Sequence, residues 1–326
     1  MLVDFQSCAE PPRLLSPEQP QLFIHFPGCG GTTVARLAHE LFGRHAVGWN
    51  TGCAAQQTDW GYALTHSSRC PCPQRACLAR VQARRALSEP EPEPRSRACM
   101  LHFFAWENPV AAPLSCFGGI WVVLRDPVER ILSRMHKEYG RNPPTIRTAQ
   151  AIAALSSTTW LPACPVGKIG RANQAESLLN ATMPPCMHEF TGSASLNDWY
   201  IRSLLGPAVF TLPLDAVNES HLEAAQAWLG RVAVVLPLAN MSALPRLLGA
   251  AGLLPAWAEN VTVGYEVSGV HSSYNDSLPV NDSLLTLLRR YNALDTRLYA
   301  HAQALFEERW ACLRSRSRRR LHPARP

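Results

Sequence analysis

Lysine is almost absent from this chain of 326 residues, which contains only Lys137 and Lys168. A phosphate-binding site in it must therefore use arginine, histidine or main-chain amides. The sequence also lacks a run of about 18 apolar residues, the length that a membrane-spanning helix needs, and its first residues contain no apolar core of signal-peptide length. We therefore expect either a cytosolic protein or a chain whose targeting or anchor segment lies outside this sequence.

Strong charge is missing from most of the chain. The net charge is +6, but the last stretch, "LRSRSRRRLHPARP", holds six arginines and no acid, so the remainder is balanced. We predict that residues 311–326 form a basic, disordered tail, with binding of nucleic acid or of a polyanionic glycan as the alternative. The apolar fraction of 47% is enough to fill the core of one large α/β domain or two small ones.

The eleven cysteines are more than a cytosolic enzyme of this size usually contains. Cys70, Cys72 and Cys77 lack the paired spacing of a zinc site, and the prolines beside them favour a disulfide-tied loop. Six glycosylation acceptors of the Asn-x-Ser/Thr type favour a glycoprotein of a secretory lumen; they are Asn180, Asn218, Asn240, Asn260, Asn275 and Asn281.

The apolar pattern predicts an α/β protein with a central parallel sheet. Buried strands are predicted at 21–26, 98–105, 118–125 and 232–238. Helices are predicted at 32–43, 195–206, 221–231 and 281–310, and one more begins after Asp126, with Pro127 at its first position. We predict an N-terminal segment, 1–19, and one three-layer domain, 20–310, with a probable insertion at 48–97.

The segment "FPGCGGTTV" lies between the first strand and the first helix. Gly28, Gly30 and Gly31 allow a tight turn whose N–H groups converge on an anion, and the helix adds the positive end of its dipole. Thr32 and Thr33 add hydroxyl groups. The alternative is a plain glycine turn. The loop lacks the lysine of a Walker A motif, which disfavours an ordinary ATPase or GTPase.

This loop and a second segment resemble the Golgi carbohydrate sulfotransferases, and most closely the heparan sulfate 2-O- and 6-O-sulfotransferases. "FIHFPGCGGTTVARL" is similar to the strand and loop that hold the donor's phosphosulfate. "VVLRDPVERILSRMH" resembles the segment that binds the donor's 3′-phosphate, with Arg125 and Ser133 in the binding positions. "NDWYIRSLLG" and "YNALDTRLYAHAQALF" resemble two later helices of the family, the first through Asn197, Arg202 and Gly206.

The resemblance implies a P-loop NTPase-like fold and a carbohydrate O-sulfotransferase of the Golgi lumen. It implies 3′-phosphoadenosine-5′-phosphosulfate as co-substrate, a carbohydrate acceptor, no metal and no nucleic acid, with membrane attachment only through an anchor absent from this chain. The residues that it assigns to the donor are Gly28, Cys29, Gly30, Gly31, Thr32, Thr33, Arg125, Ser133 and Arg202.

The sequence departs from the family at two loop positions. The family's lysine, which neutralises the leaving group, falls at Gly28, and the neighbouring threonine falls at Cys29. Arg36, one helical turn after the loop, is the predicted catalytic substitute for the lysine. We predict His39 as the general base, because it shares a helix face with Thr32 and Arg36; Glu40, His45 and His102 are the alternatives.

Two other functions are compatible with the sequence. The chain could be a non-catalytic nucleotide- or glycan-binding protein that kept the fold and lost turnover with the lysine. A small-molecule kinase is disfavoured by the missing Walker lysine. The acceptor cannot be read from the sequence, and binding of an acidic glycan would need local clusters such as Arg80, Arg84 and Arg85 or the basic tail.

Overall fold

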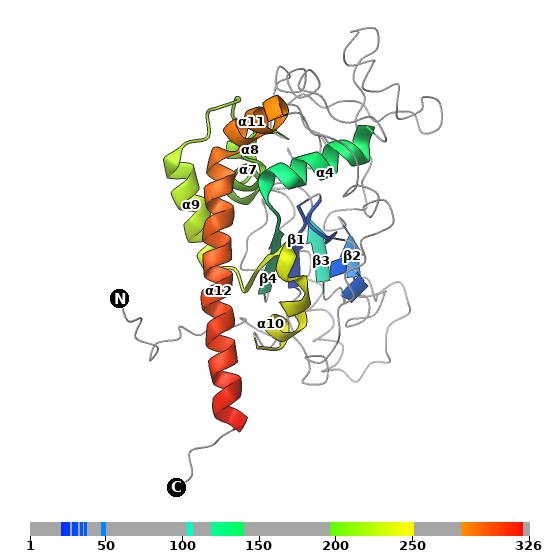
Figure 1. The fold of residues 1–326 in the computed structure, drawn as a ribbon, viewed down its shortest axis with the longest axis vertical. Coiled ribbons are helices and arrows are strands. Elements are labelled where there is room, and N and C mark those ends of the chain that lie inside the picture. Colours follow the sequence, from blue (N-terminus) through cyan, green and yellow to red (C-terminus); the bar gives the residue numbers. More distant parts are fainter. Residues whose placement is uncertain are drawn as a thin grey trace, which may run out of the picture.

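A computed structural model describes the parts of the chain that form a sheet and the helices around it. The described residues are 21–26, 28–31, 33–34, 36–37, 47–49, 103–106, 119–139, 196–250 and 282–321. The structural statements below concern these residues. They form an α/β fold with a parallel sheet, in agreement with the coarse prediction (Figure 1).

The sheet has five strands in the order β2-β3-β1-β4-β5. All four neighbouring pairs are parallel. The strands are β1 (Gln21–Ile24), β2 (Val47–Trp49), β3 (Phe103–Trp106), β4 (Gly119–Leu124) and β5 (Val234–Pro237). The four strands predicted from the apolar runs are thus present, and β2 is an additional edge strand that overlaps the start of the range predicted as an insertion, 48–97.

The first strand occupies the centre of the sheet and marks a reversal of the strand order. The chain leaves β1 for β2 on one side, whereas after β4 it continues to β5 on the other side. The carboxyl ends of β1 and β4, which are hydrogen-bonded neighbours, therefore lie at a topological switch point. In open α/β sheets ligands bind in the crevice at such a point. The residues that follow β1 and β4 are the first place to look for a site.

Strands β1, β4 and β5 are buried because their sequences are largely apolar. All six residues of β4, "GIWVVL", and all four of β5, "VVLP", are buried. Continuous apolar runs of this kind suit parallel strands, which are covered on both faces. Leu22, Phe23 and Ile24 of β1 join the same core. The sheet therefore provides a rigid support for the loops at its carboxyl edge.

The helices flank this sheet and extend beyond its edges (Figure 1). A helical segment begins at Gly31, directly after the glycine loop, and includes the described residues up to Leu37. The others are α4 (Pro127–Tyr139), α7 (Trp199–Leu205), α8 (Pro207–Phe210), α9 (Glu219–Gly230), the 3-10 helix η8 (Leu238–Ala243), α10 (Leu244–Ala250), α11 (Asp282–Tyr291) and α12 (Ala293–Leu321).

The C-terminal region predicted as helical, 281–310, consists of two helices, α11 and α12, with a break at Asn292. Helix α12 continues to Leu321, into the segment 311–326 that was predicted as a basic, disordered tail. Arginine is a good helix former, and the arginines of this segment continue the helix that the apolar residues begin.

Helix α12 holds the last strand and several helices together. Leu298, Ala302 and Phe306 are buried on one of its faces in the common core. Arg309 donates hydrogen bonds to the carbonyl oxygens of Val232 (2.7 Å) and Gly230 (3.0 Å), which satisfies acceptors at the end of α9. Within the described part of the chain, no helix is long and apolar enough to cross a membrane.

Candidate functional site

The glycine loop turns from the central strand into a helix, as predicted. Gly28 and Gly30 have φ angles of 86° and 75°, in the left-handed region that glycine adopts without strain. The amide of Cys29 donates to the carbonyl of Phe26 (3.0 Å), and the amide of Val34 donates to that of Gly30 (3.2 Å). The first turn of a helix is therefore placed directly at the carboxyl end of β1, where its N–H groups and dipole favour an anion.

Helix α4 occupies the space beside Gly28, the position at which the sulfotransferases that the sequence resembles have a lysine. A Cβ atom at Gly28 would lie 3.2 Å from the carbonyl oxygen of Arg130 and 3.8 Å from the Cβ atom of Ser133. The φ angle of 86° would strain any other residue at this position. A lysine introduced by Gly28→Lys would therefore require the backbone to move. The present loop conformation requires glycine at this position.

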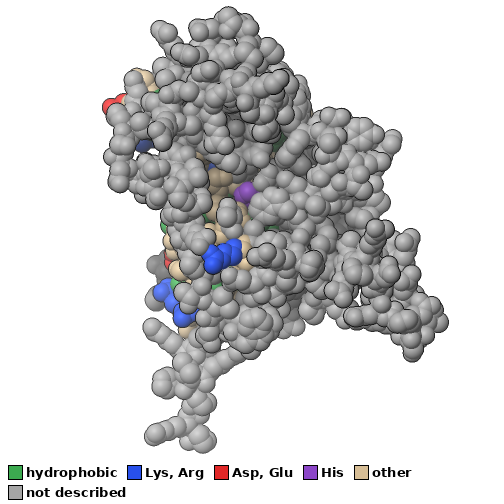
Figure 2. Space-filling view, turned by 90° about the vertical axis from the view of Figure 1, so that its right-hand side faces the viewer, with side chains coloured by type: hydrophobic (Ala, Val, Ile, Leu, Met, Phe, Trp, Pro, Cys, Tyr) green, Lys and Arg blue, Asp and Glu red, His purple; other side chains and the backbone are tan. Residues whose placement is uncertain are grey.

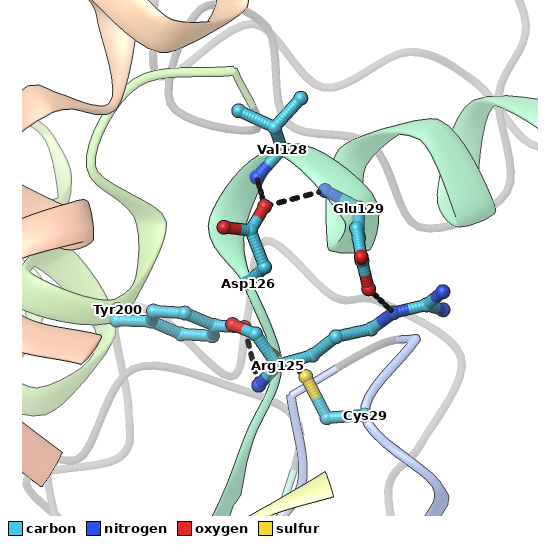
Figure 3. Close-up of polar contacts among 6 residues, drawn as sticks. All are labelled: Cys29, Arg125, Asp126, Val128, Glu129 and Tyr200. Atoms are coloured by element: carbon cyan, nitrogen blue, oxygen red, sulfur yellow. Dashed lines mark hydrogen bonds and ion pairs between the residues drawn. The ribbon is translucent and has the colours of Figure 1, made fainter. Parts of the chain in front are cut away.

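Helix α4 begins with the cap that the sequence predicted. The Asp126 carboxylate accepts hydrogen bonds from the amides of Val128 (2.9 Å) and Glu129 (3.0 Å), and Pro127 is the first helical residue (Figure 3). The preceding residue, Arg125, donates through Nε to the Glu129 carboxylate (3.1 Å), and its side chain is 28% exposed. Its two terminal nitrogens make no hydrogen bond within the described part of the chain, so they can still bind a phosphate oxygen.

Ser133, the second predicted 3′-phosphate residue, lies on α4, one helical turn after Glu129. Its side chain is buried with 8% exposure, and its hydroxyl finds no hydrogen-bond partner among the described residues. Because Ser133 is close to Gly28, the glycine loop and the predicted 3′-phosphate segment meet at this point. A buried hydroxyl without a partner normally costs free energy, and a ligand oxygen would remove that cost.

A three-way junction connects the glycine loop with the end of β4 (Figure 3). The hydroxyl of Tyr200, on α7, donates to the carbonyl of Arg125 (2.8 Å) and accepts from the amide of the same residue (3.2 Å). The Sγ atom of Cys29 lies 3.2 Å from the Tyr200 oxygen. Since the only hydroxyl hydrogen goes to the Arg125 carbonyl, the Cys29 thiol is the donor in this third contact.

This junction corrects the prediction for Cys29. Its side chain is fully buried and faces Tyr200, and its amide is used within the turn, so neither group is available to a nucleotide. Burial raises the pKa of the Cys29 thiol above its ordinary value, which keeps it protonated and able to donate. Cys29 is thus a structural residue of the loop.

Helix α7 is held in place by residues from the start of α12. The Asp295 carboxylate accepts hydrogen bonds from the amides of Tyr200 (2.8 Å) and Ile201 (3.0 Å). Asp198 precedes the helix with a φ angle of 44°, makes no cap bond within its own helix, and accepts from the amide of Asp295 (2.9 Å) instead. Each aspartate thus satisfies main-chain donors of the other segment. A buried carboxylate of α12 takes the place of the usual N-cap of α7.

The two aspartates are predicted to make stability depend on pH. Burial, followed by the nearby charge of Asp198, raises the pKa of Asp295 to about 8, and burial raises that of Asp198 to about 6. Groups with raised acid pKa values bind more protons in the folded state, so their contribution is complete below about pH 4 and is lost as the pH rises to about 8. We expect Asp295→Asn to flatten the decline in melting temperature between pH 5 and pH 9. Equal slopes for the variant and the wild type would contradict this.

Arg202 is part of the fold and not of the donor site. Its guanidinium is fully buried, and its N–H groups donate to the side chain and carbonyl of Asn197. The remaining contacts go to the carbonyl oxygens of Val209, Phe210, Leu212 and Pro213. No donor remains for a phosphate, which corrects the assignment of Arg202 to the nucleotide.

The remaining predicted residues are only partly covered by the structure. Thr33 is buried and Arg36 is exposed, both on the helical segment after the loop. Thr32 and the predicted base His39 lie outside the described residues, as do the alternative bases Glu40, His45 and His102. The cysteine cluster 70–77 and four of the six glycosylation acceptors also lie outside them, whereas Asn218 is exposed and Asn240 is partly exposed.

Three residues next to the loop were not singled out in the sequence: Tyr200, Arg130 and His25. The guanidinium of Arg130 is buried between aromatic rings, 5.4 Å from the centre of the Trp199 ring and 5.6 Å from that of Tyr200. The imidazole of His25 fills the space beside Gly31, where a Cβ atom would lie 1.9 Å from its Nε2 atom. Of the three, only His25 could have been found from the sequence, because it is a polar residue directly after a central strand. Tyr200 and Arg130 lie within helices and carry no such local signal.

Comparisons with known proteins do not identify this chain. No protein-family model matches it, and no curated protein matches its sequence. Its function must therefore be inferred from the arrangement of its own residues.

Proposed function

We propose that this protein is a sulfotransferase that uses 3′-phosphoadenosine-5′-phosphosulfate and transfers the sulfuryl group to a hydroxyl of a carbohydrate. The observation that carries the proposal is the buried, unpartnered hydroxyl of Ser133, which lies beside Gly28 of the glycine loop. A loop suited to one phosphate meets there the segment of Arg125 and Ser133, whose side chains suit another, at the switch point of a parallel sheet. That arrangement fits a nucleotide with separate 5′ and 3′ groups.

Each half of the site has its own chemistry. The amides of Gly28, Gly30 and Gly31 and the start of the following helix would bind the 5′-phosphosulfate, and Arg125 and Ser133 would bind the 3′-phosphate. In the reaction, the acceptor oxygen forms a bond to sulfur while the bond from sulfur to the bridging oxygen breaks, and the acceptor proton passes to a base. The loop amides stabilise the charge that develops on the departing nucleotide. The three-layer, P-loop NTPase-like architecture is part of this proposal.

The charge that lysine supplies in the family must come from an arginine in this chain. Arg36 is exposed on the helical segment one turn after the loop, and helix side chains lean towards the N-terminus, where the anion would lie. Arg130 is the buried alternative, and its side chain borders Gly28, with Cγ 3.5 Å from the position of a Cβ atom there. His39 remains the proposed base. Removal of Arg36 should abolish transfer and spare nucleotide binding if it is the substitute.

Binding of adenosine 3′,5′-bisphosphate, the desulfated product, tests the donor site directly. Calorimetry should show binding of this ligand in preference to ATP with magnesium, and Arg125→Ala should weaken it about 10- to 100-fold through the loss of charged hydrogen bonds. Arg297→Ala is the matched control, because this arginine is exposed and pairs only with Glu219. Absence of binding to the folded wild type would remove the donor assignment.

Ser133→Ala is a second test, because it should leave the stability of the free protein unchanged or slightly higher and yet lower its affinity for the bisphosphate. In the free protein it removes a hydroxyl that has no partner, so we expect unchanged stability or a small increase. In the complex it removes a phosphate contact, so affinity for the bisphosphate should fall about tenfold. Lower stability with unchanged affinity would instead mean that Ser133 is a packing residue.

The acceptor and the compartment follow from the same proposal. The sequence-derived glycosylation acceptors favour the Golgi lumen, and Asn218 is exposed where an attached glycan would need it. Figure 2 shows basic side chains and a histidine reaching the surface among the described residues, which suits a local contact with an anionic glycan. Glycosidase treatment of the natively expressed protein should increase its mobility in a gel.

A non-catalytic nucleotide-binding protein is the second candidate. It is favoured by one observation, the φ angle of 86° at the position of the family's lysine, which fits glycine and no cationic residue. Both candidates bind the bisphosphate, so the discriminating measurement is transfer of labelled sulfate to a set of glycans. Binding without any transfer would favour the second candidate.

A further inference from the structure

Tyr200 is a described residue of a third element, α7, that touches both proposed phosphate-binding halves. Its hydroxyl contacts the main chain of Arg125, which belongs to the 3′-phosphate half. It also contacts the side chain of Cys29 in the glycine loop. With one donor and two acceptor positions, this hydroxyl is fully used by the three contacts. Figure 3 shows it between the end of β4 and the loop that follows β1.

The position of Tyr200 is fixed by packing and by hydrogen bonds from other elements. Its side chain is fully buried, and its ring centre is 4.7 Å from that of Phe26, at the end of β1. The Arg130 guanidinium of α4 lies over the same ring. The Tyr200 amide is bound by the Asp295 carboxylate of α12. The hydroxyl is thus held by three elements outside its own helix, and it cannot move without breaking these contacts.

We propose that Tyr200 is a positioning residue that sets the separation between the loop that binds the 5′-phosphosulfate and the segment that binds the 3′-phosphate. This inference rests on the proposed function. A nucleotide with two phosphates is held by both halves at once, so its affinity depends on their separation, whereas a monophosphate engages one half. The Tyr200 hydroxyl contacts no ligand itself in this arrangement. It contributes to binding only by fixing the positions of Arg125 and Cys29.

The test compares three ligands on one variant. Tyr200→Phe removes the hydroxyl and keeps the ring against Phe26 and Arg130. We expect it to weaken binding of adenosine 3′,5′-bisphosphate about tenfold and to change the affinities for adenosine 3′-monophosphate and adenosine 5′-monophosphate less than about twofold. The affinities are measured by competition, with melting temperature and near-ultraviolet circular dichroism as checks on folding.

Two further variants complete the design. Tyr299→Phe is the matched control: this tyrosine is near the site, where burial and the charges of Asp126 and Glu129 raise its pKa, but its hydroxyl makes no hydrogen bond within the described part of the chain. It should bind all three ligands as the wild type does. Cys29→Ala removes only the thiol contact and should give the pattern of Tyr200→Phe with a smaller loss. It keeps the inference testable if Tyr200→Phe does not fold.

The outcomes separate this inference from the proposed function. Selective loss of bisphosphate affinity in Tyr200→Phe supports the positioning role. Equal losses for all three ligands, or no loss for any, overturn it and leave the donor site intact, because the wild type still binds the bisphosphate. No binding of the bisphosphate by the folded wild type overturns the proposed function, and the inference with it.

Discussion

Replacing Arg202 with methionine is expected to lower the free energy of unfolding by about 3–5 kcal/mol, the cost of removing one member of a buried charged network. The guanidinium is fully buried and donates hydrogen bonds to main-chain carbonyl oxygens, among them those of Asn197 and Pro213. These acceptors would be left without donors inside the protein, and Asp198 and Asp295 would lose a nearby positive charge. Urea unfolding of the variant and the wild type measures the difference.

Arg297→Met is the control for this prediction. Arg297 lies on α12 with 56% of its side chain exposed and forms a surface ion pair with Glu219. Such pairs contribute little, so we expect a change within about 1 kcal/mol. If Arg202→Met were as mild as the control, the carbonyl network would not be a main support of the fold. A soluble Arg202→Met that folded normally but lost only bisphosphate affinity would return Arg202 to the donor site.

The sequence predicted the features that depend on neighbouring residues. Asp126 and Pro127 form the start of α4 as expected, because a cap and the first helical residue are adjacent in the chain. The glycine loop and the central strands were also predicted, since each is a local pattern of apolar residues and glycines. These features place the proposed donor site.

The residues that organise the site could not be predicted, because their partners are distant in the sequence. Tyr200 contacts Arg125 and Cys29 across separations of 75 and 171 residues. Arg202 was expected at a phosphate because it matched a family position, but the carbonyl oxygens that surround it belong to a turn that no pattern revealed. The break at Asn292 is likewise fixed by its contact with the distant Leu196 carbonyl (2.6 Å).

Both ends of the proposed donor site would therefore depend on one buried assembly. Asp295 fixes the start of α7, α7 presents Tyr200, and Tyr200 joins the glycine loop to the end of β4. The unpartnered hydroxyl of Ser133 is next to this assembly and is not part of it. Ser203 on α7 also has a buried hydroxyl without a described partner, but the hydroxyl of Ser133 belongs to a side chain beside Gly28, where an oxygen of the proposed ligand could satisfy it.

Gly31→Ala is expected to disrupt the loop through His25. A Cβ atom at position 31 would lie 1.9, 2.3 and 2.5 Å from three atoms of the imidazole, far inside contact distance, so the ring must leave its place. Its centre is 5.6 Å from that of the Phe23 ring, and Phe23 is fully buried, which restricts where it can go. We expect a loss of about 3 kcal/mol in the free energy of unfolding, the upper end of the cost of overpacking.

A double variant identifies the cause of that loss. His25→Ala removes the ring, so adding Gly31→Ala to it should have little further effect on stability, whereas the same change in the wild type is severe. Gly230→Ala is the matched glycine control, because a Cβ atom there meets nothing within 4 Å; it should be neutral or stabilise α9 by up to about 1 kcal/mol. Additive losses in the double variant would show that position 31 requires glycine for its backbone, and that the contact with His25 is incidental.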